Sequence, residues 1–297
     1  MEFFTELLNK QYDSDTVQKI LNGLKVDRVM SFRVNTLKTT VDSVISVLNS
    51  ESIPYTQVEW YECAFMVDSK YQEHIESLSI YSSGHIYIQS LSSMLPPLIL
   101  NPKEKITILD MCASPGGKTT ELASLTQGKS QITACELNKI RLEKLKYNID
   151  KQGAKSVYVM NVDSRFLDDF YSFDSVLLDA PCSGSGTLDL NNPNTFKYFT
   201  KVLIDKSVKA QKALLNKALN VLKVGESLVY STCSILQCEN EDIVLCALNS
   251  GRCVVEPIDL TKFKGMELLP NCIDGVVTVC PNNTYEGFFV AKLKKIK

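Results

Sequence analysis

The stretch Ile106-Thr-Ile-Leu-Asp-Met-Cys-Ala-Ser-Pro-Gly-Gly-Lys-Thr119 decides the fold of this chain. It opens with a short apolar run that is typical of a buried strand, passes through a tight turn with two glycines, and enters a helical pattern that ends near Leu125. Further strands are expected at 131–136, 157–163, 173–179 and 227–231, and further helices at 139–151 and 201–221. Strands that alternate with helices form βαβ units, so we predict a doubly wound, Rossmann-like α/β sheet.

The two ends of the chain add to this prediction. Residues 287–293 form a late apolar run that could insert into the sheet as a further strand. The first hundred residues indicate a helix at 16–24 capped near Asp13, a strand at 28–34, a helix at 40–48 and an extended run at 58–67. We predict a small α+β domain over residues 1–95 and a larger domain over residues 96–297, with the junction in Leu91–Leu100, which contains Pro96-Pro97.

Composition excludes several classes of protein. Of the 297 residues, 44% are hydrophobic and 22% are charged, as in an ordinary globular protein. No apolar run is long enough to cross a bilayer, and the first residues lack the basic and apolar blocks of a signal peptide. We therefore expect a cytoplasmic protein, a monomer, without a membrane partner.

The cysteine content bears on metal binding, and the charge bears on nucleic-acid binding. The ten cysteines should be reduced thiols in that compartment. There is no Cys-x-x-Cys pair and there are only two histidines, so we expect no metal site. The net charge of −2 gives no sign of a nucleic-acid partner, and the lysine clusters at 201–217 and 292–297 are expected to be solvated surface.

The glycine-rich turn resembles a phosphate-binding loop only at its end. Gly117-Lys118-Thr119 matches the last residues of that loop, but the first glycine should stand five residues before Gly117, where this chain has Cys112. The dinucleotide fingerprint G-x-G-x-x-G is also absent. The turn is therefore expected to approach a ligand other than a polyphosphate.

Carboxylates at the strand ends indicate which ligand that is. Asp110, Glu136, Asp163 and Asp179 each follow an expected strand. The acid after the second strand of such a sheet can accept both ribose hydroxyls, and Asp163 can reach an adenine amine. Four acids would repel a polyphosphate but suit a nucleoside that carries a cation, such as S-adenosylmethionine. Taken singly, each acid is more often only a strand-end cap or a surface charge.

Two of the expected strands, at 173–179 and 227–231, lead into cysteines. Cys182 follows Asp179-Ala-Pro, and Cys233 follows Ser231-Thr. Ligands bind at the carboxyl ends of parallel strands, and a thiolate there can attack a substrate covalently. The alternative is that both cysteines are small buried residues, as free cysteine usually is.

Taken together, these segments resemble the Nop/Sun (Fmu) family of RNA cytosine-C5 methyltransferases. The segments that carry the resemblance extend over most of the chain: 32–38 (FRVNTLK), 88–93 (IQSLSS), 109–119 (LDMCASPGGKT), 179–187 (DAPCSGSGT), 231–235 (STCSI) with 239–241 (ENE), and 287–293 (GFFVAKL). The resemblance implies a class I methyltransferase fold in the larger domain and S-adenosylmethionine as the methyl donor. Some positions depart from the family pattern, among them Ser114, Glu286 and the arginine-free run 188–193.

The resemblance also implies roles for individual residues. The donor site would be formed by the glycine-rich turn and by the residues around it: Cys112, Ala113, Ser114, Pro115, Gly116, Gly117, Lys118, Glu136, Arg141, Asp163 and Asp179. Within it, Glu136 would hold the ribose and Asp163 the adenine. Cys233 matches the nucleophile of the family, Cys182 its second cysteine, and Lys118 a lysine that helps to position the target pyrimidine. Asp179 would lie between donor and base.

The chemistry explains why two thiols are needed. The C5 atom of cytosine is a poor nucleophile, and addition of a thiolate at C6 converts the ring into an enamine that can accept a methyl group. A hydrogen bond from Asp179 to N3 favours the addition, and Cys182 is a candidate base for the C5 proton. The residues alone leave open which thiol attacks, because the Pro-Cys cysteine is the nucleophile in DNA cytosine methyltransferases.

The expected substrate is RNA. Ribosomal RNA is favoured because a partly assembled particle would compensate for a weakly basic surface, and transfer RNA is the alternative. Arg28, Arg33 and Lys38 make the small domain a candidate RNA platform, although that domain could equally be a structural cap. A non-catalytic assembly factor with the same fold is the competing hypothesis from another class of function.

Overall fold

The computed structural model describes all 297 residues and has a central sheet of nine strands. Eight strands follow the order β11-β12-β13-β9-β8-β5-β6-β7, and β10 pairs with β13. Their bounds are β5 Thr107–Asp110, β6 Gln131–Cys135, β7 Val157–Met160, β8 Phe173–Asp179, β9 Leu222–Thr232, β10 Cys253–Val255, β11 Leu268–Leu269, β12 Val277–Val279 and β13 Phe288–Lys295. Strands β5 to β9 are parallel to one another, and β13 inserts antiparallel between β9 and β12. The predicted doubly wound sheet and its late inserted strand are confirmed.

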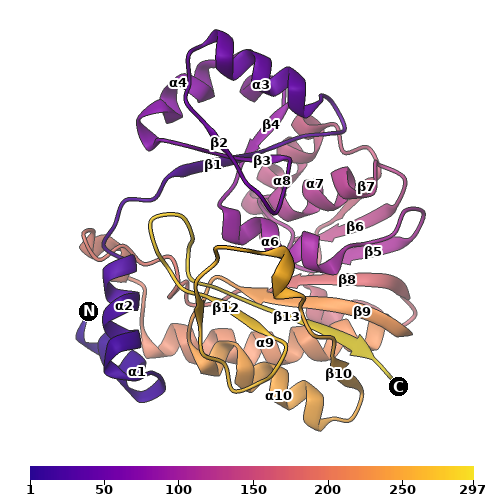
Figure 1. Ribbon diagram of the computed structural model, residues 1–297. Coiled ribbons are helices and arrows are strands. Elements are labelled where there is room, and N and C mark those ends of the chain that lie inside the picture. Colours follow the sequence, from indigo (N-terminus) through magenta and orange to yellow (C-terminus); the bar gives the residue numbers. More distant parts are fainter.

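Helices cover both faces of this sheet (Figure 1). The helices that follow or flank the strands are α6 Leu91–Leu100, α7 Gly117–Leu125, α8 Lys139–Gln152, α9 Lys201–Val221 and α10 Glu241–Asn249. Successive residues of each central strand point to opposite faces. Ile108 packs in the core shared with α6 and α7, whereas its neighbour Leu109 packs in the core shared with α9 and α10. The apolar runs without polar alternation therefore correspond to strands that are buried on both sides.

A second sheet of four antiparallel strands lies over the α6–α8 face (Figure 1). Its elements are β1 Met30–Val34, α3 Val41–Ser50, β2 Thr56–Gln57, β3 Ala64–Val67, α4 Gln72–Ser77, α5 Ser79–Ser82 and β4 Ile86–Ile88. Phe32 and Phe65 stack in its centre with ring centroids 5.5 Å apart. They share one core cluster with Leu122 of α7 and Val290 of β13, so the small sheet and the large sheet are packed together.

Two segments differ from the sequence-based expectation. The predicted extended run 58–67 is strand only in β3, because residues 59–62 form a turn. The predicted junction Leu91–Leu100 is helix α6, and Pro96 and Pro97 lie inside it. Proline removes a helical hydrogen bond, which is why the pair suggested a connection. Eight of the ten residues of α6 are buried, and this burial keeps the segment helical.

The chain begins with two helices that pack far from the small sheet. Helix α2 Ser14–Gly23 was expected, and Asp13 caps it by accepting a 2.8 Å hydrogen bond from the Thr16 amide. Helix α1 Glu2–Gln11 was not expected. Phe4 of α1 packs against Phe199, ahead of α9, and Figure 1 shows both helices well apart from β1–β4. The division into domains at residues 95 and 96 stays a prediction.

The remaining helical segments are short. They are single turns of 3-10 helix in loops: η1 Ser69–Tyr71, η2 Ser164–Phe166, η3 Pro193–Phe196, η4 Gln237–Glu239 and η5 Leu260–Lys262. None of the helices in the structure combines the length and apolar character needed to cross a lipid bilayer.

Candidate active site

The two candidate thiols meet at the carboxyl edge of the sheet. Strands β8 and β9 are parallel neighbours, with Asp179 opposite Ser231, so the loops that follow them leave the sheet side by side. Cys182 lies in the first loop and Cys233 in the second. Their sulfur atoms are 3.3 Å apart, close enough to hydrogen-bond and to reach the same substrate ring.

A buried glutamate ties the two cysteine loops together. Glu239 accepts hydrogen bonds from the Ser183 amide at 2.7 Å, the Ser183 hydroxyl at 2.6 Å and the Ser234 hydroxyl at 2.6 Å. The Gly186 amide also donates to the Cys233 carbonyl at 3.0 Å. Sequence reasoning gave Glu239 no role, and its only signal was its place in the segment 239–241 that carried the resemblance. Its three bonds fix the residues on either side of the thiols.

Lys118 and Asp179 form an ion pair that joins the glycine-rich turn to β8. The Lys118 ammonium lies 2.8 Å from one Asp179 oxygen and donates to the Ser93 hydroxyl at 2.6 Å. The other Asp179 oxygen accepts from the Ser231 hydroxyl at 2.8 Å. Burial acts to lower the pKa of Lys118, but the negative charges of Asp179 and Cys233 outweigh it, and the pKa is raised. Lys118 is therefore a fixed cation near the Cys233 sulfur.

The thiol of Cys182 is a weak acid in this setting. Its hydrogen bond with Cys233 and its burial both raise the pKa of Cys182 well above the ordinary value. Cys182 therefore favours the protonated thiol form at neutral pH, and either sulfur of the pair could donate the hydrogen bond between them.

The glycine-rich turn follows β5 and leads into α7. Gly116 has φ of 109°, in the left-handed region where glycine is favoured, and an added Cβ would lie 3.1 Å from Leu145. Below the turn, Asp110 accepts a 2.7 Å hydrogen bond from the Thr119 hydroxyl. Burial raises the pKa of Asp110 to about 6, and its second oxygen is buried without a partner. This carboxyl group is suited to a cationic or hydrogen-bond-donating ligand.

The other predicted donor residues lie after the next two strands. Glu136 follows β6, is buried, and accepts a 2.7 Å hydrogen bond from the Asn138 amide. The Arg141 side chain lies 3.6 Å from the Glu136 carboxylate and donates to the Ser114 carbonyl at 2.8 Å. Asp163 caps the turn after β7 and pairs with Arg165 at 2.6 Å, and hydrogen bonds from Arg165 lower the pKa of Asp163. Residues Cys112 to Lys118, Glu136 and Arg141 thus lie around one loop.

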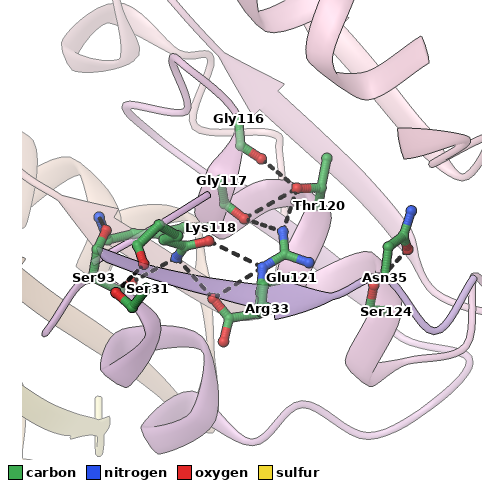
Figure 2. A network of polar contacts seen from close by, with 11 residues as sticks. Ser31, Arg33, Asn35, Ser93, Gly116, Gly117, Lys118, Thr120, Glu121 and Ser124 are labelled. Atoms are coloured by element: carbon green, nitrogen blue, oxygen red, sulfur yellow. Dashed lines mark hydrogen bonds and ion pairs between the residues drawn. The ribbon is translucent and has the colours of Figure 1, made fainter. Parts of the chain in front are cut away.

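Arg33 does not lie on the protein surface, where an RNA-contacting residue was expected. It points inward from β1 and is fully buried (Figure 2). It donates to the Gln89 side chain at 3.0 Å, the Gly117 carbonyl at 2.8 Å and the Thr120 hydroxyl at 2.6 Å. The Glu121 carboxylate lies 3.9 Å away. Arg33 cannot contact RNA, and the expectation that it belongs to an RNA platform is wrong: it joins the small sheet to the start of α7.

A cavity of about 430 Å³ opens beside the ion pair of Lys118 and Asp179. Its walls include the glycine-rich turn, Ser93 and Glu286, and it extends between β4 and α8. Neither Glu136 nor Asp163 lines it. Ser93, which contacts Lys118, is a further residue that sequence reasoning left without a role. No cluster of three His, Cys, Asp or Glu side chains in the structure is arranged to hold a metal ion.

Comparison with known protein families shows which family this chain belongs to. Residues 97–294 match the profile described as 16S rRNA methyltransferase RsmB/F, and residues 2–73 match the ferredoxin-like domain described for the same proteins. The chain belongs to the RsmB/F methyltransferase family. This family membership and the neighbouring structures described next support S-adenosylmethionine as the cofactor.

Individual relatives agree with the family match. The chain is 33% identical to ribosomal RNA small subunit methyltransferase F of Shewanella loihica, with 97% of this chain and 63% of that protein covered. It is 32% identical to the protein of the same name from Erwinia tasmaniensis, with 96% and 61% covered. The chain thus spans less than two thirds of the length of these RsmB/F relatives.

Solved structures share the whole fold. NSun6 from Pyrococcus horikoshii, solved with SFG, superposes with a TM-score of 0.85 at 25% identity and covers 100% of this chain and 97% of that one. A methyltransferase homologue from Pyrococcus horikoshii gives a TM-score of 0.79 at 29% identity, with 100% of both chains covered.

Proposed function

We propose that this RsmB/F family member transfers a methyl group from S-adenosylmethionine to C5 of a cytosine in RNA of the small ribosomal subunit. The observation that carries the proposal is the 3.3 Å separation of the Cys182 and Cys233 sulfur atoms, beside the ion pair of Lys118 and Asp179. Methylation of an amine needs no covalent step and no thiol, whereas methylation at C5 needs a nucleophile and a base.

The donor site is assigned to the residues around the glycine-rich turn. Glu136 would accept the ribose hydroxyls, Asp163 would face the adenine, and Arg141 with the residues from Cys112 to Lys118 would enclose the remainder of the donor. The unpartnered oxygen of buried Asp110 supports a ligand with a donor group at this place. SFG, with which the neighbouring structure was solved, is an analogue of S-adenosylmethionine. When bound, the donor supplies a methyl group on a sulfonium cation.

The residues of this chain account for the remaining steps. The Cys233 thiolate adds to C6 of the cytosine, so that a sulfur–carbon bond forms and the electron pair moves towards C5. A protonated Asp179 would donate a hydrogen bond to N3 and so favour the addition, while Lys118 holds the Asp179 carboxyl group in place. After C5 has accepted the methyl group, Cys182 first releases its own thiol proton to solvent, and the thiolate then removes the C5 proton. The freed electron pair restores the double bond and expels Cys233.

The choice of RNA rests on the named relatives. The matched curated proteins are methyltransferases of small-subunit ribosomal RNA, which favours that RNA over transfer RNA for this chain. The target base must leave its stack to reach the thiols, which costs roughly a few kcal/mol and is easiest in a loop or single strand. We further propose that the protein acts as a monomer in the cytoplasm, where thiols stay reduced.

Bisulfite sequencing of total RNA from cells with and without the gene tests the function. The expected result is the loss of one 5-methylcytosine in small-subunit ribosomal RNA, which returns with the wild-type gene but not with Cys233→Ala. Loss of a site in transfer RNA instead would support the alternative substrate. No lost site would favour a non-catalytic assembly factor and would overturn the proposal.

A further inference from the structure

A crevice leads away from the catalytic ion pair, between the small sheet and helix α8. It is part of the cavity of about 430 Å³, which lies within the usual range for ligand sites. One wall carries Tyr81 of α5 and Tyr87 of β4, and the facing wall carries Lys144, Asn148 and Lys151 of α8. The crevice is separate from the residues assigned to the ribose and adenine of the donor, since none of these lines it.

Negative and positive charges are separated along the crevice. Two other cations of α8 are compensated, because Arg141 lies 3.6 Å from Glu136 and Lys146 lies 2.9 Å from Glu143. Lys144 and Lys151 have no carboxylate within ion-pair distance. The three carboxylates that line the cavity are all at its catalytic end: Asp110, Asp179 and Glu286. The arm between the tyrosines and α8 is therefore positively charged, although the chain as a whole has a net charge of −2.

Lys151 is influenced by the Glu76 carboxylate, which raises its pKa but offsets only part of the effect of burial. Its ammonium lies 3.7 Å from the centroid of the Tyr81 ring, and burial lowers the pKa of Lys151. The main-chain carbonyl of Lys151 accepts a 2.7 Å hydrogen bond from Lys38, which also donates to the Ser83 carbonyl at 2.9 Å. These bonds fasten the end of α8 to the α5 side of the crevice, so the distance between the two walls is fixed.

The second tyrosine is also fixed. The Tyr87 hydroxyl accepts from the Asn148 side chain at 3.5 Å, and the guanidinium of buried Arg33 lies 5.2 Å from its ring centroid. Aromatic rings beside lysines are the usual combination for single-stranded nucleic acid, because bases stack on the rings while lysines neutralise phosphates.

We propose that this crevice binds the RNA nucleotides next to the target cytosine, with Lys144 and Lys151 on the phosphates and Tyr81 and Tyr87 against the bases. The proposal rests on the proposed function, because it requires an RNA strand whose target base reaches Lys118 and Asp179. Each lysine contributes one phosphate contact, and Tyr81 contributes an aromatic surface that phenylalanine would preserve.

The test is the affinity of the whole protein for a fluorescein-labelled single-stranded RNA oligonucleotide, measured by anisotropy over a range of salt concentrations. For the double variant Lys144→Ala/Lys151→Ala we expect binding at least about tenfold weaker, and a slope of log K against log salt that is smaller by about 1.4. Lys146→Ala, on the same helix but paired with Glu143, is the control and should bind like the wild type. Tyr81→Phe should retain affinity, whereas Tyr81→Leu should lose it several-fold.

Separate readouts distinguish failure of this proposal from failure of the proposed function. The affinity for S-adenosylmethionine should be unchanged in every crevice variant, and the KM for RNA should rise while kcat stays within about twofold. An unchanged affinity and salt slope in the double variant would overturn the crevice proposal, even if the wild-type protein methylates RNA. A wild-type protein that binds RNA through the crevice but transfers no methyl group would overturn the proposed function instead.

Discussion

Two sulfur atoms 3.3 Å apart cannot both be thiolates at neutral pH without strong repulsion, so the pair must share protons unequally. The bond with Cys233 and burial both raise the pKa of Cys182. We propose that Cys233 is the sulfur that attacks and that Cys182 later receives the C5 proton. This assignment follows the family resemblance, because the contact between the two sulfur atoms is symmetric.

The first prediction separates these two roles. Cys182→Ala should still form the sulfur–carbon bond through Cys233 and accept one methyl group, but it should fail to release the product because no base removes the C5 proton. Loss of a general base slows a step by about 10²–10⁴-fold. Denaturing gel electrophoresis should then show an RNA–protein adduct with ordinary cytosine, and Cys182→Ala/Cys233→Ala should show none. Normal turnover by Cys182→Ala would rule out its role as the base.

Buried Glu121 gives the stability of the protein a defined pH dependence. Burial is the main cause that raises the pKa of Glu121 from 4.5 to about 8. Between these values the folded protein holds a proton that the unfolded chain has released. The free energy of unfolding must therefore fall as the pH rises through this window, by up to about 1.4 kcal/mol per pH unit from this group.

Glu121→Gln removes the titrating group and should make the free energy of unfolding less dependent on pH. Urea unfolding at about pH 6 and about pH 8 should show a smaller loss of stability in the variant than in the wild type. Asp110, whose pKa is also raised by burial, contributes equally to both proteins and cancels in the comparison. The matched control is Glu143→Gln, which changes an exposed glutamate of α8. Equal slopes for the wild type and Glu121→Gln would show that Glu121 is ionised in the folded protein.

At the scale of elements, the two cysteine loops depend on a close contact with β13. A Cβ added to Gly186 would lie 1.9 Å from the Gly287 carbonyl oxygen, at the start of that strand. Gly186→Ala should therefore displace the loop that carries Cys182, lower the free energy of unfolding by about 1–3 kcal/mol and abolish adduct formation. Gly128→Ala is the control for adduct formation: its φ of 68° makes the substitution cost some stability, but its added Cβ would come no closer than 3.6 Å to Leu37, so the adduct should still form. Full activity in Gly186→Ala would show that the contact is not needed.

The elements of the catalytic sheet could be predicted because their signals are local. Apolar runs marked the strands, and the capping residue Asp13 marked the start of α2, where it accepts from the Thr16 amide at 2.8 Å. The parallel arrangement then placed Asp110 and Asp179 at the same edge as the two thiols. Helix α6 was missed because its two prolines are a local signal that burial overrides.

The contacts that complete the site could not be predicted because they join distant parts of the chain. Ser93 and Lys118 are 25 residues apart, and Glu239 and Ser183 are 56 residues apart. Arg33 was misplaced for a related reason. An arginine is normally exposed, and only the arrangement of Gln89, Gly117 and Thr120 around it accounts for its burial.

For the whole molecule, the shared core predicts that the small sheet and the catalytic sheet unfold together. Trp60, the single tryptophan of the chain, lies between β2 and β3 and donates to the Tyr285 hydroxyl at 3.1 Å. Its fluorescence therefore reports on the contact between the two sheets. Urea unfolding followed by this fluorescence should coincide with unfolding followed by circular dichroism. A fluorescence transition at a lower urea concentration would show that the small sheet detaches first.

The most direct test of the central claim is to trap the protein on RNA that carries 5-fluorocytosine at the target position, because fluorine cannot leave as a proton does. In the presence of S-adenosylmethionine, we predict a stable RNA–protein adduct whose cross-linked peptide contains Cys233, formed by the wild type and by Cys182→Ala. An adduct that survives Cys233→Ala and disappears in Cys182→Ala would reverse the roles of the thiols. The absence of any adduct on RNA that the protein methylates would contradict covalent catalysis altogether.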